Sequence, residues 1–368
     1  MFRELAETES PQSENIQVPD REPPSDTFKQ SWADVSSEIQ EQSATKKNQS
    51  SQERSPSLNC LEGLPEELLA DIVSYAGERS LSYLSSARTP LTEIVCPSGI
   101  GTLYSLSLTN RLFHRLAQPI LYHHCTRGRR FSYLRTLVTN PQLARYVKSI
   151  KFSLDKDRYP DLSKYSDTKK IVIDRMEKYD QEFNFLAAQY MRDHWNGDQG
   201  ETDDAALTTI LMHAPSIEAI SIRYSHDIGN PGKYQPRWIE PIKLRFPHSF
   251  DKLKIAVFDH TELPLQTIEI LLQLPSLQTL NMEWTNIHDE HPADFAPQSS
   301  TVQHLGIIMC PVRARVLLNL IETCKTLRSF MFEQMDDYCG DRALHDFHAI
   351  LDRHNETLES VRFIIYDT

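Results

Sequence analysis

A six-residue pattern of apolar residues recurs beyond residue 130 and constrains the fold more than any other feature of the sequence. Apolar residues fill the first, fourth and sixth positions, as expected of a half-buried strand. The copies span residues 147–152, 217–222, 253–258, 277–282, 302–307, 327–332 and 358–363. From Leu253 onward the copies start 24, 25, 25 and 31 residues apart, whereas the earlier steps are 70 and 36. This period predicts one strand and one helix per repeat, with insertions in the first units.

The segments between the strands carry the matching helical pattern. Apolar residues recur at three- and four-residue spacing in 207–213, 265–274, 312–324 and 344–354, and Pro215 and Pro275 follow two of these segments. Each unit exposes a hydrophobic face that only its neighbour can cover, so several units must stack. Residues 131–368 are therefore predicted to form an α/β domain with a curved parallel sheet and outer helices. A closed α/β domain remains the alternative, because βα alternation alone does not fix the curvature of the sheet.

These units resemble degenerate leucine-rich repeats, whose pattern is Leu-x-x-Leu-x-Leu-x-x-Asn or Cys. The unit with Val302, Leu305, Ile307 and Cys310 matches this pattern in full. In other units the final Asn or Cys is missing or displaced, as with Thr285 and Asn286. We therefore expect no regular asparagine ladder.

Two short helical segments precede the repeats. Pro65 suits the first position of a helix, where its missing N–H has no partner to lose, and Glu66 and Glu67 place negative charge at the positive helix end. The apolar face of this helix contains Leu68, Leu69, Ile72, Val73 and Tyr75. The second segment contains Leu106 and Leu108, and then a helix predicted to start at the capping residue Asn110 and to carry Leu112, Phe113, Leu116 and Ala117.

Together the two segments resemble the F-box, which opens with Leu-Pro and an acidic Leu-Leu helix and closes with an apolar helix before Leu-Ala. The linker at 77–102 is longer than is usual in that family, and Asn110 replaces the common Cys or Ser. The resemblance implies a small helical domain, residues 58–125, that binds a Skp-family adaptor and through it a cullin. It assigns the adaptor contacts to Leu64, Pro65, Leu68, Leu69 and Ile72, with Leu106, Leu108 and Phe113 completing the fold or its rim. The alternative is that these residues form the core of an ordinary helical hairpin.

The composition changes near residue 57. Residues 1–57 are rich in Ser, Pro and Gln and poor in large apolar side chains, so we expect a disordered tail. Within it, Phe28, Trp32, Val35 and Ile39 fall on one face of a possible helix at 28–39. This segment could dock on a partner, although four such residues also fit a transient helix.

Two insertions interrupt the first repeats. Residues 153–206 contain a predicted helix at 171–195 and an acidic loop at 198–204, and residues 225–250 form a proline-rich loop with Trp238. Insertions in repeat arrays often belong to the binding surface. Packing or capping is the alternative for both.

Residues that alternate with the core positions are predicted to point to the concave face of the sheet, because side chains change sides with period two. This face mixes aromatic, apolar and acidic groups, a composition that suits a protein partner. The predicted target-binding residues are Arg223, Asn281, Glu283, Trp284, Ile308, Met331 and Glu333. A merely solvated face, with recognition by the loop at 225–250, is the alternative.

No motif in the chain indicates catalysis, a cofactor or a metal site. His288 and His291 lack the spacing of a zinc helix, and His123, His124 and Cys125 are expected on a loop or rim. The six cysteines form no CxxC pair, and a formal charge of −12 gives no general attraction for nucleic acid or membranes. A basic cluster at 127–130 is read as a solvated junction rather than an RNA contact. The N-terminus has no signal-peptide pattern, so we expect a cytoplasmic or nuclear protein.

The combined prediction is a non-enzymatic substrate receptor of an SCF-type ubiquitin ligase. Its F-box would bind the adaptor, and its repeat domain would bind an unidentified target protein. The alternatives are a leucine-rich-repeat scaffold without a ligase role and, third, an enzyme of unrecognised type. The scaffold alternative requires that the helical segments merely cap the repeats. The enzyme alternative requires a deep pocket with converging titratable residues.

Overall fold

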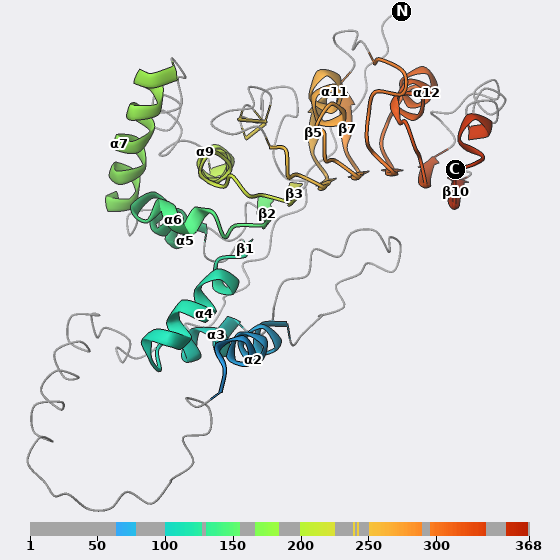
Figure 1. Cartoon of the computed structure of the whole chain (residues 1–368). Helices are drawn as coiled ribbons and strands as arrows, with labels where there is room; N and C mark the ends of the chain where they lie inside the picture. The colour runs from blue at the N-terminus through green and yellow to red at the C-terminus, as the bar shows by residue number, and fades with distance from the viewer. Residues whose placement is uncertain are drawn as a thin grey trace, which may run out of the picture. The chain divides into compact units, whose positions relative to one another are not determined.

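The computed structural model describes residues 64–78, 100–126, 130–154, 166–183, 199–224, 238–239, 241–242, 250–288, 295–335 and 351–366 (Figure 1). The tail with its predicted helix at 28–39, the basic residues at 127–129 and most of the loop at 225–250 lie outside these residues.

Three helices near the start of the described chain form a small cluster with its own core. They are α2 (Glu66–Glu78), α3 (Ile100–Ser107) and α4 (Arg111–Leu121). Their buried apolar side chains are Leu69, Val73, Leu103, Phe113 and Ala117. The Asn110 side chain caps α4, as predicted, by accepting a hydrogen bond of 2.9 Å from the backbone N–H of Phe113. The guanidinium of Arg115 pairs with Glu66 at 2.6 Å and so ties α4 to the first turn of α2.

The remaining described residues are built around an open parallel sheet of eight strands. In spatial order these are β1 (His124–Thr126), β2 (Ser149–Leu154), β3 (Ala219–Tyr224), β4 (Ile255–Asp259), β6 (Thr279–Glu283), β8 (His304–Ile308), β9 (Ser329–Met335) and β10 (Ser360–Tyr366). Each strand is parallel to its neighbours, and spatial order follows chain order. Two short strands, β5 (Glu262–Pro264) and β7 (Asn286–His288), form a second parallel pair. The predicted α/β class with a parallel sheet is confirmed.

Helices connect most of these strands. They are α5 (Arg130–Thr139), α6 (Pro141–Ala144), α7 (Ser166–Phe183), α9 (Gln199–His213), α11 (Leu265–Leu272) and α12 (Ala314–Thr323), with the 3-10 helix η4 (Asp352–His354) before β10. Figure 1 shows α11 and α12 on the same side of the sheet. Buried side chains of α9, α11 and α12 share one core with alternate strand residues.

The strand register explains that core. The fourth positions of the sequence pattern, such as Ile220, Leu280 and Leu305, align across neighbouring strands, and so do the sixth positions, such as Met282 and Ile307. All of these residues are buried in the shared core. The period-two prediction of the core-facing positions is therefore confirmed for the central strands.

Three sequence-based boundaries need correction. His124 and Cys125, expected on a loop or rim at the end of the helical domain, lie in β1, and Cys125 is buried in the core of the sheet. Residues 199–204 of the expected acidic loop belong to α9, where Asp204 is fully buried. The helix predicted at 171–195 is described as α7, Ser166–Phe183, and residues 184–198 lie outside the described chain.

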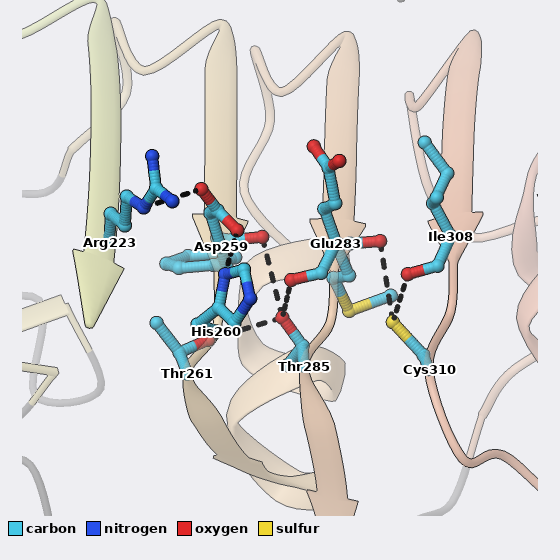
Figure 2. A network of polar contacts seen from close by, with 10 residues as sticks. Arg223, Asp259, His260, Thr261, Glu283, Thr285, Ile308 and Cys310 are labelled. Carbon is cyan, nitrogen blue, oxygen red and sulfur yellow. Dashed lines mark hydrogen bonds and ion pairs between the residues drawn. The ribbon is translucent and has the colours of Figure 1, made fainter. Parts of the chain in front are cut away.

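A ladder of hydroxyl and thiol groups follows the strand ends (Figure 2). Thr285 donates to the carbonyl oxygens of Phe258 and Glu283 at 3.3 and 3.2 Å, and the Cys310 thiol donates to those of Met282 and Ile308, both at 3.3 Å. Thr261 occupies the preceding rung, 3.3 Å from the Thr285 hydroxyl. None of these three rungs is an asparagine: Thr285 fills its rung, and Asn286 follows it as the first residue of β7. Small donors thus satisfy buried carbonyl groups between the repeats.

Burial makes the described cysteines unreactive. It raises the pKa of Cys310 and of Cys324 to about 12, and it raises that of Cys125 as well. Because the thiolate is the nucleophile, the folded chain should resist iodoacetamide at these three cysteines near neutral pH, and unfolding in urea should release all three. Site-resolved mass spectrometry after alkylation measures this. Fast labelling of Cys310 without denaturant would contradict its placement in the ladder.

Ion pairs mark the opposite margin of the sheet, where the strands begin. Glu218 pairs with Lys148 at 2.6 Å and with Lys254 at 2.9 Å, and these hydrogen bonds lower the pKa of Glu218 to about 2. Because the folded-state pKa lies below the unfolded one, the stabilisation is complete above the unfolded pKa and is lost as the pH falls toward about 2.

The substitution Glu218→Gln tests this linkage. We expect the variant to melt below wild type at neutral pH, with the gap narrowing as the pH falls from about 7 to 3. The effect should be small, because Glu218 is one-third exposed. Calorimetry across this range measures it, and a gap that widened in acid would contradict the assignment.

Candidate functional site

The helical cluster leaves an apolar face of α2 open to solvent. Leu68, Ile72 and Tyr75 are 48%, 42% and 59% exposed, whereas Leu69 and Val73 are buried in the core of the cluster. The helix therefore has two apolar faces, and only one of them is needed to pack α3 and α4. Exposed apolar side chains at this spacing are typical of a docking surface.

The other predicted adaptor residues divide in the same way. Leu69 and Phe113 are buried, Leu64 and Leu106 are half-buried and pack against the cluster, and Pro65 and Leu108 are exposed. The structure thus separates residues that hold the cluster together from residues that a partner could reach. Tyr75 was assigned to the apolar face but not to the contact, although its position three residues after Ile72 was a usable signal. Tyr104, also exposed, was missed.

The sheet face opposite the helices brings the predicted target-binding residues into two rows. Arg223, Asp259, Glu283, Ile308 and Glu333 share one register across the strands. In the adjacent row, Asn281 lies between Val257 and Gly306, and Met331 follows. Six of the seven predicted residues are thus aligned in register, and Trp284 follows the end of β6.

The depth of these residues differs from the expectation. Asn281, Ile308, Met331 and Glu333 are buried rather than exposed. Glu333 pairs with Arg362 at 3.0 Å and accepts a hydrogen bond of 3.3 Å from the hydroxyl of Tyr366. The period-two pattern determines on which face of the sheet a side chain lies, but it does not determine whether other residues cover that side chain. Of the seven predicted residues, Arg223 and Trp284 are exposed and Glu283 is half-buried.

A charged network lies where the strands end (Figure 2), and an aromatic stack adjoins it. Arg223 pairs with Asp259 at 3.2 Å, and Asp259 also contacts the imidazole of His260. The His260 ring stacks on Trp284, with centroids 5.8 Å apart and planes 12° apart. His260, Trp284 and Met309 have positive φ angles of 54°, 51° and 51°, an uncommon conformation for such residues. The same turn thus repeats in three successive units and presents these residues at one margin of the sheet.

One pair of residues in the second row is sterically matched. A Cβ atom added to Gly306 would lie 2.1 Å from Asn281 Oδ1 and 3.0 Å from its Cγ. Glycine is therefore required for the observed rotamer of Asn281. The Oδ1 and Nδ2 atoms of that side chain are buried and have no hydrogen-bond partner among the described residues.

The titratable side chains of the described residues do not meet the needs of a metal ion. Across them, no three His, Cys, Asp or Glu side chains are grouped so as to hold a metal ion. The rings of His123 and His124 stack with their centroids 4.4 Å apart. Burial is the larger cause, and the charge of His123 the smaller, that lowers the pKa of His124 to about 4. No helix in the described ranges is long and apolar enough to cross a membrane. The two exposed faces are suited to binding.

Comparison with known proteins gives no assignment. No protein-family model matches the sequence, and no curated protein matches it significantly.

Proposed function

We propose that this chain is a substrate receptor of an SCF-type ubiquitin ligase. In this proposal the helical cluster docks on a small Skp-family adaptor, which links it to a cullin, and the sheet domain holds a target protein. The chain itself performs no bond chemistry and acts by raising the local concentration of the target beside the ubiquitin-loaded enzyme. Such a subunit would work in the cytoplasm or nucleus.

The observation that carries this proposal is the second apolar face of α2. Leu68, Ile72 and Tyr75 remain exposed although α2 already contributes Leu69 and Val73 to the core of the cluster. A helix that merely capped the repeats would bury its apolar residues against them. The exposed face therefore favours docking on a partner over the scaffold alternative.

Several features support a leucine-rich-repeat-like solenoid as the receptor domain. Spatial strand order follows chain order without reversal, whereas a doubly wound α/β sheet reverses its order at a switch point. Among the described strands, β1 and β10 lie at the two ends of the order and do not pair with each other, so these strands do not close into a barrel. The rungs Thr261, Thr285 and Cys310 recur at the position where such repeats place Asn or Cys.

Affinity purification of the tagged full-length chain from cells, followed by mass spectrometry, tests the proposed function. We expect the adaptor and a cullin among the most abundant partners, in comparable molar amounts. Purification of the intact chain without either protein would contradict the ligase role and would leave the scaffold alternative.

A further inference from the structure

Asn281 occupies an unfavourable environment that the fold does not explain. The residue is 3% exposed, and its amide nitrogen and oxygen have no hydrogen-bond partner among the described residues. A buried polar group without partners destabilises a protein, and an apolar residue of similar size is usually neutral or better. A ligand that pairs with this carboxamide would account for its presence.

The residue beside Asn281 on the neighbouring strand is a glycine and has no side chain. Gly306 is its register partner on β8, and any Cβ there would collide with Oδ1. The carboxamide thus extends over a bare backbone position, between Val257 on one side and Met331 on the other. A carboxamide offers a donor and an acceptor together, which matches the N–H and C=O groups of an extended polypeptide.

The strand end beyond Asn281 favours a positive charge. Glu283 lies two residues further along β6 and is followed by Trp284. Trp284 is 41% exposed, and its ring stacks on that of His260. Asp259 is the register partner of Glu283 on β4 and is ion-paired with Arg223. An arginine side chain can stack on an indole ring and pair with carboxylates at the same time. The formal charge of −12 on the chain adds general attraction for a basic partner.

We propose that the face formed by β6 and β8 binds an extended, arginine-containing segment of a partner protein. The backbone of the segment pairs with the carboxamide of Asn281, and its arginine stacks on Trp284 beside Glu283. Because Asn281 is covered in the unbound chain, binding requires rotamer changes around it, which are common at interfaces. The inference rests on the proposed function in one respect: the segment is taken to belong to a protein that the ligase targets.

The test uses the purified full-length chain and a phage-displayed library of random 12-residue peptides. Selected peptides should be enriched in arginine over the unselected library. A fluorescein-labelled synthetic copy of the strongest binder then gives affinities by fluorescence polarisation. We expect Trp284→Ala and Asn281→Ala each to weaken binding by about tenfold or more, and Glu283→Gln to weaken it less. Replacing the arginine of the peptide by citrulline should also weaken binding, because citrulline keeps the shape but removes the charge.

Thermal melting separates this role from a structural one. Asn281→Ala should leave the melting temperature unchanged or raise it, since it removes an unpaired buried amide. Glu359→Gln removes an exposed carboxylate at the opposite margin of the sheet and should leave peptide affinity unchanged. The inference is overturned if arginine is not enriched, or if the selected peptide binds Asn281→Ala and Trp284→Ala as tightly as wild type. The assay contains no adaptor, so its failure and the failure of adaptor docking are distinguishable.

Discussion

Replacement of both Leu68 and Ile72 by aspartate should abolish co-purification of the adaptor and cullin. Each new carboxylate would enter a desolvated interface without a partner, which costs several kcal/mol. For the pair this corresponds to about a thousandfold loss of affinity or more, enough to eliminate an ordinary complex. Immunoblotting of the adaptor and cullin after purification of the tagged variant measures the effect.

The same double substitution should leave the protein folded. Both side chains are already more than 40% exposed, so their removal opens no cavity. Leu68 also lies near the N-terminus of α2, where the helix dipole favours negative charge. Circular dichroism and melting curves close to those of wild type are therefore expected.

Two matched variants make the result interpretable. Val361→Asp places the same charge on an apolar side chain that is 47% exposed on β10, outside the helical cluster, and it should leave adaptor recovery unchanged. Leu69→Asp buries the charge in the core of the cluster and should disrupt the cluster itself. Adaptor recovery from Leu68→Asp with Ile72→Asp at the wild-type level would remove the basis of the ligase proposal.

The parallel sheet was predictable because its signal is strong and repeated. At each copy, apolar residues at period two must face the helices, as Leu280 and Met282 do, and the repeat length leaves room for only a short connection. The register of the central strands followed from the same spacing. The exposed face of α2 followed from an apolar surface wider than one packing seam requires.

Other features depend on information that the pattern does not carry. β1 has three residues, two of them polar, so no alternation marks it as a strand. The start of α9 was read as an acidic loop, although acidic residues also favour the first turn of a helix. The burial of Asn281 and Met331 depends on what lies over the sheet, and period two determines only the side on which a residue lies.

The insertion at 225–250 illustrates a choice that only packing could decide. Trp238 is fully buried, stacks on Phe258 at 5.5 Å, and donates its backbone N–H to the buried carboxylate of Asp204 at 2.9 Å. Ile239 and Ile242 are also buried in the core of the sheet domain. At these residues the insertion packs against the sheet domain rather than forming an exposed binding loop.

Trp238→Ala should therefore be strongly destabilising. Removing a buried tryptophan side chain costs about 3–5 kcal/mol, through lost burial and the cavity left behind. This is a large part of the roughly 5–15 kcal/mol that separates folded from unfolded domains. The expected fall in melting temperature is on the order of 10 °C, measured by calorimetry of the full-length chain.

Trp284→Ala provides the matched comparison, because it makes the same chemical change at a tryptophan that is 41% exposed. Its indole contributes stacking on His260 but little core burial, so the melting temperature should fall far less than in Trp238→Ala.

The two variants should also differ in peptide binding. Trp238→Ala acts through unfolding, and peptide binding should return when the assay is cooled well below its melting temperature. Trp284→Ala removes a proposed contact, and no cooling should restore binding to it. Equal destabilisation by the two substitutions would show that Trp238 does not anchor the insertion in the core.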